Sequence, residues 1–194
     1  MRIISKAARR AQLLAERCEV ADDVRAEEAT ALCAHLAALA IDGNTVCAYA
    51  PIGTEPGSMA MLDELQRLSA RVLLPVVRTT DEDVPMALQW GEYRPGTLVA
   101  ARFGLLEPAQ PWLPAATLAE ADVVVVPALA VDRQGVRLGR GGGFYDRSLS
   151  LADPTARLVA VVRDRELVDQ LPSDQHDVPM THALTPGLGV VALV

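Results

Sequence analysis

The sequence is short of lysine. Of its 18 basic residues, 17 are arginine and one is lysine, Lys6. A phosphate-binding loop of the G-x-x-x-x-G-K-[ST] type needs a lysine inside a glycine-rich loop, so the position of Lys6 near the N-terminus excludes that type. A Schiff-base or pyridoxal-phosphate enzyme would also have to use Lys6. The 25 acidic residues give a net charge of -7, which disfavours broad nucleic-acid binding.

Long apolar runs are absent as well. The longest, around residues 123–131, is far shorter than the about 18 residues that a membrane-spanning helix needs. The N-terminal segment places basic residues among alanines, without the uninterrupted apolar stretch of a secretory signal. The three cysteines, Cys18, Cys33 and Cys47, are odd in number and form no C-x-x-C pair, which indicates reduced thiols packed as small core residues. We therefore expect a cytoplasmic protein, monomeric, with no membrane partner.

Helical and extended segments alternate along the chain. We expect helices at 2–17, 22–39 and 58–68, the start of a helix at 145–149, and a loop-rich stretch at 91–114. Strands are expected at 45–50, 72–77, 86–90, 122–131, 157–162 and 189–194. Continuous apolar strands alternating with helices are typical of a parallel sheet that is covered on both faces. The pattern predicts an α/β fold: a single three-layer α/β/α domain over residues 1–194, with a mostly parallel central sheet and ligands above the carboxyl ends of its strands.

The most informative segment is 137–146, RLGRGGGFYD. Five of the 13 glycines lie within nine residues, at 135, 139, 141, 142 and 143. The segment follows the strongest predicted strand and leads into a helix, so its backbone N–H groups can face an anion. Arg137 and Arg140 add donors that suit phosphate oxygens. These features favour a phosphate-binding loop over a simple tight turn.

The spacing of this loop excludes one familiar alternative. A dinucleotide-binding G-x-G-x-x-G motif that started at Gly139 would need a glycine where Phe144 stands, and one that started at Gly141 would need it at Asp146. Asp146 follows the loop directly. A carboxylate beside bound phosphates commonly holds Mg²⁺, although an acid in the first turn of a helix is also favoured by the helix dipole.

The run 137–147, RLGRGGGFYDR, resembles the signature of 5-formyltetrahydrofolate cyclo-ligases, also called 5,10-methenyltetrahydrofolate synthetases. Segments 6–10, 49–55, 103–108 and 170–177 resemble further elements of that family in the same order. The resemblance implies that ATP and Mg²⁺ are used to convert 5-formyltetrahydrofolate to 5,10-methenyltetrahydrofolate, with release of ADP and phosphate. It implies phosphorylation of the formyl oxygen and ring closure by N10. Such a reaction needs a positioned γ-phosphate and neutralised charge.

The resemblance also implies the role of each site residue. The expected catalytic groups are Lys6 and Arg140. Expected ATP contacts are Lys6, Arg10, Arg137, Leu138, Gly139, Arg140, Gly141, Gly142, Gly143, Phe144 and Tyr145. Expected contacts of the small-molecule substrate, 5-formyltetrahydrofolate, are Glu55, Arg140, Gly141, Gly142, Gly143 and Phe144. Asp146 and Asp177 are the expected Mg²⁺ ligands.

Physical reasoning supports two of these roles and leaves alternatives open. Lys6 and Arg10 are four residues apart on one helical face, so both can reach the same phosphates; a solvated basic face is the alternative. Glu55 can accept hydrogen bonds from pterin N–H groups, or it is an ordinary loop or capping acid. His176 stands in the late segment without an assigned role, and none of the three histidines has metal-site spacing.

The sequence departs from the family pattern at two places. The first of two tyrosines before the aspartate is Phe144 here, which preserves stacking but removes a hydroxyl contact. Glu55 is followed by Pro-Gly-Ser, where the family usually has Val-Asp-Thr. Two other functions stay open: a folate- or nucleotide-binding protein of the same fold without turnover, and an ATP-independent sugar-phosphate isomerase. The second lacks a clear carboxylate base other than Glu55.

Overall fold

A computed structural model describes residues 5–39, 41–174 and 177–193. Its main sheet has seven strands in the order β12-β11-β9-β6-β1-β2-β3. They are β1 (Thr45–Cys47), β2 (Arg71–Val76), β3 (Gln89–Glu92), β6 (Val123–Pro127), β9 (Arg157–Val161), β11 (His182–Thr185) and β12 (Gly189–Ala192). Strands β11, β9, β6, β1 and β2 run parallel, whereas β3 and β12 pair antiparallel at the two edges. The mostly parallel sheet is as the sequence predicts.

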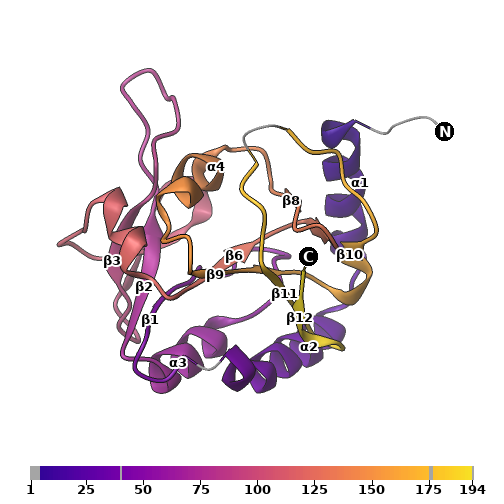
Figure 1. Cartoon of the computed structure of the whole chain (residues 1–194), viewed down its shortest axis with the longest axis horizontal. Coiled ribbons are helices and arrows are strands. Elements are labelled where there is room, and N and C mark those ends of the chain that lie inside the picture. Colours follow the sequence, from indigo (N-terminus) through magenta and orange to yellow (C-terminus); the bar gives the residue numbers. More distant parts are fainter. Residues whose placement is uncertain (1–4, 40, 175–176, 194) are drawn as a thin grey trace.

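Helices and short turns cover both faces of this sheet (Figure 1). One face carries α2 (Asp22–His35), the 3₁₀ turn η1 (Leu36–Leu39) and α3 (Met59–Leu68). The other carries η3 (Ala115–Glu120), α4 (Phe144–Ser148) and η4 (Leu149–Leu151). Neighbouring strand residues serve opposite layers: Val46 packs into the first core and Cys47 into the second. The predicted three layers are confirmed, with short turns in place of long helices on the second face.

Two small sheets complete the fold. One joins β10 (Leu167–Val168), β7 (Ala130–Asp132) and β8 (Arg137–Leu138), and the other pairs β4 (Leu98–Ala100) with β5 (Leu106–Pro108). The turns η2 (Arg102–Gly104) and η5 (Asp164–Glu166) lie between strands. Helix α1 (Lys6–Cys18) packs Leu13 in one cluster with Leu129, which precedes β7, and Leu138 of β8. This packing places α1 beside the glycine loop.

Several predicted elements differ from the structure. The apolar run 122–131 forms two strands, because Pro127 has no N–H for further pairing and the chain leaves the main sheet after it. The strand predicted at 86–90 begins at Gln89, and Met86 is exposed in the connection before it. The stretch 91–114, predicted to be loop, contains β4 and β5. Strand β11 was not predicted.

Helix α2 begins at residue 22, as the sequence predicts, with Ala21 as its N-cap and Asp22 and Asp23 as acids of its first turn. Cys47 is buried as expected, but Cys18 is exposed. Within the described ranges, no helix has the length and apolar character needed to cross a membrane.

Candidate functional site

A cavity of about 470 Å³ opens at the carboxyl ends of the central strands. Its walls include Tyr49 after β1, Val77 after β2 and Ala128 after β6. In an open parallel sheet this edge is where ligands bind, since the loops that follow the strands converge there. The glycine loop 139–143 forms another wall of the same cavity. The fold therefore joins the predicted loop to a pocket of ligand size.

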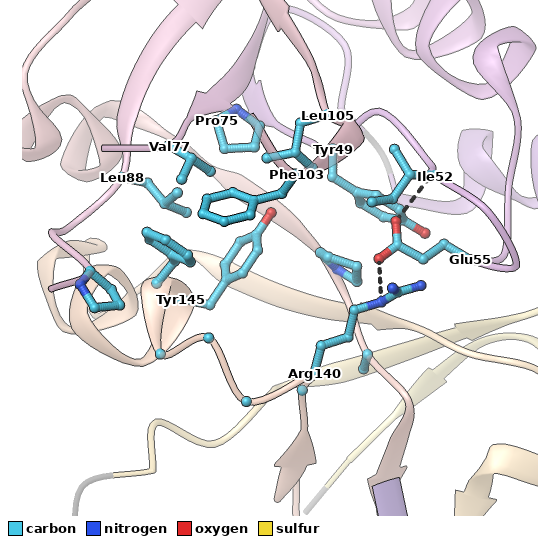
Figure 2. Close-up of a pocket in the computed structure, with 18 of the residues that line it drawn as sticks. Tyr49, Ile52, Glu55, Pro75, Val77, Leu88, Phe103, Leu105, Arg140 and Tyr145 are labelled. Atoms are coloured by element: carbon cyan, nitrogen blue, oxygen red, sulfur yellow. Dashed lines mark hydrogen bonds and ion pairs between the residues drawn. The ribbon is translucent and has the colours of Figure 1, made fainter. Parts of the chain in front are cut away.

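Apolar side chains make up most of the wall. Pro75, Val77 and Leu88 lie on one side, and Phe103 and Leu105 extend over them (Figure 2). Phe103 has φ of 61°, a backbone conformation that a non-glycine residue rarely adopts. Its side chain is largely exposed. Such walls suit the flat faces of a heteroaromatic ring, with a few polar groups left to orient it.

Glu55 is the buried carboxylate of this cavity. Its side chain is 8% exposed; Oε1 lies 3.1 Å from Nε of Arg140, and Oε2 accepts a 3.0 Å hydrogen bond from the Ile52 N–H (Figure 2). Burial raises the pKa of Glu55, opposed by the Ile52 N–H and by the positive charges of Arg140 and Arg17. Because Arg140 is 44% exposed, its guanidinium can leave the carboxylate without crossing the core.

The glycine loop follows β8 in a conformation that needs glycine. Gly141 has φ of 96° and Gly143 has φ of 73°, values that residues with a Cβ rarely adopt. Arg10 of α1 reaches this loop and donates from Nε to the Gly139 carbonyl at 2.9 Å. The loop is thus held against α1, as expected if both supply groups to one ligand.

Arg137 is the buried cation of the loop. Its side chain is 7% exposed and donates a 2.5 Å hydrogen bond to Oδ1 of Asp146, while its Nε has no partner. Burial lowers the pKa of Arg137, and the negative charges of Asp146 and Asp177 oppose that change. A guanidinium held in this way, with a donor unused, suits an oxyanion at the rim of the cavity.

Lys6 is bound to two acids at the start of α1. Its Nζ donates to Oδ2 of Asp174 at 2.6 Å and to Oδ2 of Asp177 at 3.0 Å. Partial burial alone would lower the pKa of Lys6, but the acid pair outweighs it and the pKa is raised. For Asp177, partial burial is outweighed by the Asp174 N–H and by Lys6, so its pKa is lowered. These two ion pairs hold the start of α1 against the chain at Asp174 and Asp177.

The predicted residues gather into two groups around the rim. The first group lines the cavity, and Arg10 joins it from α1 through its bond to the Gly139 carbonyl. Its lining members are Glu55, Arg137, Arg140, Phe144, Tyr145, Asp146 and the glycines at 139 and 141–143. Lys6 and Asp177 form the second group, linked to the first by the charge of Arg137. The Leu138 side chain is buried in the cluster that contains Leu13 of α1, so only the backbone of Leu138 is available to a ligand. His176 lies outside the described residues.

Sequence reasoning missed Asp174 and the buried Arg17. Arg17 lines the cavity and is 1% exposed; it donates to the Ala128 carbonyl at 2.6 Å and to both carboxylate oxygens of Glu166 at 2.8 and 2.7 Å. A signal for Arg17 was present, because Lys6, Arg10 and Arg17 fall at i, i+4 and i+11 on one helical face. Nothing in the sequence alone pairs Lys6 with Asp174.

Asp146 and Asp177, which both act on the charge of Arg137, are the carboxylates available to a metal ion at this site. In the part of the chain that the structure describes, no group of three or more His, Cys, Asp or Glu side chains is placed to hold a metal. Asp146 and Asp177 still fit Mg²⁺, which usually takes one or two carboxylates and completes its shell with phosphates and water. Both now bond to cations, so a bound metal would replace Arg137 and Lys6 as their partners.

The fold and site define an α/β protein with a largely apolar cavity above a mostly parallel sheet, beside an arginine- and glycine-rich loop. A sequence profile of the 5-formyltetrahydrofolate cyclo-ligase family matches residues 2–186. The 5-formyltetrahydrofolate cyclo-ligase of Mycolicibacterium smegmatis is 61% identical over 189 residues, 97% of each chain. That of Escherichia coli strain K12 is 32% identical over 145 residues, 74% of this chain and 78% of the other. The chain belongs to the 5-formyltetrahydrofolate cyclo-ligase family and is an enzyme of that family.

Solved structures agree with the fold. The NMR structure of Aquifex aeolicus 5,10-methenyltetrahydrofolate synthetase superposes with a TM-score of 0.77 at 24% identity, covering 97% of this chain and 93% of the other. A 5,10-methenyltetrahydrofolate synthetase from Mycoplasma pneumoniae gives a TM-score of 0.69 at 18% identity, covering 91% and 96%. At these identities the likeness establishes the three-layer architecture.

Proposed function

We propose that residues 1–194, acting as one domain, convert 5-formyltetrahydrofolate to 5,10-methenyltetrahydrofolate with consumption of Mg·ATP and release of ADP and phosphate. The reaction proceeds through phosphorylation of the formyl oxygen and ring closure by N10. One observation carries the proposal: a buried, arginine-paired carboxylate faces an apolar cavity whose rim is the glycine loop. Family membership supports the same reaction. We also propose a cytoplasmic location, which suits the three free thiols.

The folate occupies the apolar cavity in this proposal. Glu55 accepts hydrogen bonds from N–H groups of the pterin, a task for which its carboxylate must be ionised. Phe144 and the glycines contribute ring stacking and close backbone approach. Arg140, which now pairs with Glu55, turns to the reacting oxygens when folate takes its place at the carboxylate. This exchange leaves neither charge buried without a partner.

ATP binds on the other side of the loop. Lys6, Arg10 and Arg137 provide positive charge for the phosphates, and the backbone from Leu138 to Tyr145 provides N–H donors and close approach. Mg²⁺ held by Asp146 and Asp177 supplies neutralisation of charge on the phosphate oxygens. Lys6 and Arg140 are the catalytic groups of the proposal: Lys6 would neutralise charge on the γ-phosphate, and Arg140 would neutralise charge at the reacting oxygens. Positioning and charge neutralisation are what phosphoryl transfer requires of a protein.

A direct assay tests the function. The wild-type protein is incubated with 5-formyltetrahydrofolate and Mg·ATP, and methenyl absorbance and ADP are followed together. We expect both to appear in equal amounts. A folded protein that binds ATP and forms no methenyl product would refute the proposal.

A second candidate is a folate- or nucleotide-binding protein of the same fold without turnover. The completeness of the charged set argues against it, since Lys6, Arg10, Glu55, Asp146 and Asp177 are all present. Tight folate binding by calorimetry, with no ATP consumed, would favour this candidate over the enzyme.

A further inference from the structure

One hydroxyl group in the cavity has no hydrogen-bond partner. Among the described residues, four buried side-chain atoms lack one: Gln66 Oε1, Trp90 Nε1, Arg137 Nε and Tyr145 OH. Of these four residues, only Arg137 and Tyr145 line the main cavity. Arg137 already has a task in phosphate binding under the proposed function. The Tyr145 hydroxyl is left without one.

This hydroxyl lies in the wall of the cavity. Tyr145 is the second residue of α4, and its side chain extends from the glycine loop with the hydroxyl at the inner end (Figure 2). The ring packs with the second core layer, and the Arg137 guanidinium lies 5.6 Å from the ring centroid. The base of the side chain is thus fixed by packing, and its polar tip is buried among the residues that line the cavity.

Retaining such a hydroxyl needs a reason. A buried O–H without a partner destabilises the folded chain, and a phenylalanine would fill the same space without that cost. The preceding residue, Phe144, is already a phenylalanine. A tyrosine hydroxyl carries its proton at neutral pH, so it is available as a hydrogen-bond donor.

We propose that Tyr145 is a folate-binding residue whose hydroxyl donates a hydrogen bond to a carbonyl oxygen of the bound folate. Glu55 accepts hydrogen bonds from the same ligand. The cavity would therefore recognise N–H donors of a flat ring through Glu55 and a carbonyl acceptor of that ring through Tyr145. The inference rests on the proposed function. The hydroxyl of Tyr145 is assigned to folate. Its backbone, directly after the glycine loop, stays with the ATP contacts of the proposed function.

Replacement Tyr145→Phe removes the hydroxyl alone. We expect the dissociation constant for 5-formyltetrahydrofolate, measured by calorimetry without ATP, to rise about 3- to 10-fold, as for one lost hydrogen bond. The dissociation constant for ADP should not change. The thermal midpoint of the unliganded variant should equal or exceed that of the wild type, because an unpaired buried hydroxyl has been removed.

Tyr93→Phe is the matched control. The Tyr93 hydroxyl donates to Asp63 at 2.6 Å, and Tyr93 does not line the cavity. This variant should bind folate like the wild type. An unchanged folate affinity in Tyr145→Phe, a loss of ADP affinity instead, or a lowered thermal midpoint would each overturn the inference. Failure of the proposed function is read separately, from wild-type protein that binds no folate and forms no product.

Discussion

At the scale of single residues, Glu55 carries the clearest electrostatic consequence. Glu55→Gln keeps the shape and an acceptor for the Ile52 N–H but removes the charge that Arg140 and the ligand N–H groups share. Hydrogen bonds to a charged group contribute about 1.5–3 kcal/mol, so folate affinity should fall by roughly 10- to 100-fold. The affinity for ADP should be unchanged. Calorimetry of both ligands measures this, and Glu92→Gln, an exposed acid, is the control.

The raised pKa of Glu55 gives this prediction a pH dependence. The folded chain takes up the proton more readily than an ordinary glutamate, so the carboxylate is present only above the raised pKa and is lost as the pH falls through it. The folate affinity of the wild type should decline as the pH falls through the raised pKa of Glu55. The folate affinity of Glu55→Gln should not change over the same pH range. The same shift means that ionised Glu55 lowers the stability of the unliganded fold above this window. A wild-type affinity that improved on acidification would contradict the assignment.

Lys6 is tested at the same scale against a neighbour on its own helix. Lys6→Ala removes the ammonium that now bonds to Asp174 and Asp177, and we expect ATP affinity to fall about tenfold while folate affinity holds. Arg9→Ala is the matched control, because Arg9 donates to Gln12 on the exposed side of α1. Equal ATP affinities for Lys6→Ala and the wild type would remove Lys6 from the nucleotide site.

At the scale of elements, the sequence predicts what is local. Runs such as 72–77 and 123–126 are β-branched and apolar, so the parallel sheet follows from them. The glycine loop is likewise visible because its chemistry lies within ten residues. Strand β11 was missed because HALT is short and carries no alternation. The pairing of Lys6 with Asp174, 168 residues away, depends on tertiary packing that no local pattern encodes.

At this scale we predict that the buried ion pair between Arg17 of α1 and Glu166 stabilises the fold. Glu166 is 1% exposed and accepts hydrogen bonds from Nε and Nη2 of Arg17. It also accepts a hydrogen bond from the Arg163 backbone N–H at 2.8 Å. Glu166→Gln leaves a buried guanidinium without its counter-charge, which typically lowers the free energy of unfolding by about 3–5 kcal/mol. Urea unfolding measures the loss. Glu120→Gln breaks an exposed pair with Arg71 and should change stability by about 1 kcal/mol at most; equal losses in the two variants would refute the role of the buried pair.

At the scale of the whole molecule, the two ligands should act from opposite sides of one loop. Arg10 contacts the glycine loop from α1, the helix that also carries Lys6, whereas Glu55 and the apolar walls line the cavity that the loop borders. A ligand at 100 times its dissociation constant stabilises the fold by about 2.7 kcal/mol, or roughly 5–10 °C in a chain of this length. ADP and 5-formyltetrahydrofolate should therefore each raise the thermal midpoint of the wild type on their own.

The two single variants should separate these shifts. Lys6→Ala, measured by thermal unfolding at fixed ligand concentration, should lose most of the ADP shift and keep the folate shift, because Lys6 belongs to the proposed phosphate-binding set and does not line the cavity. Glu55→Gln should do the reverse, since its carboxylate faces the cavity. The double variant should lose both shifts additively, as expected for groups without a shared partner. If either single variant abolished both shifts, the loop would not divide two sites, and the two-sided arrangement of ATP and folate would have to be abandoned.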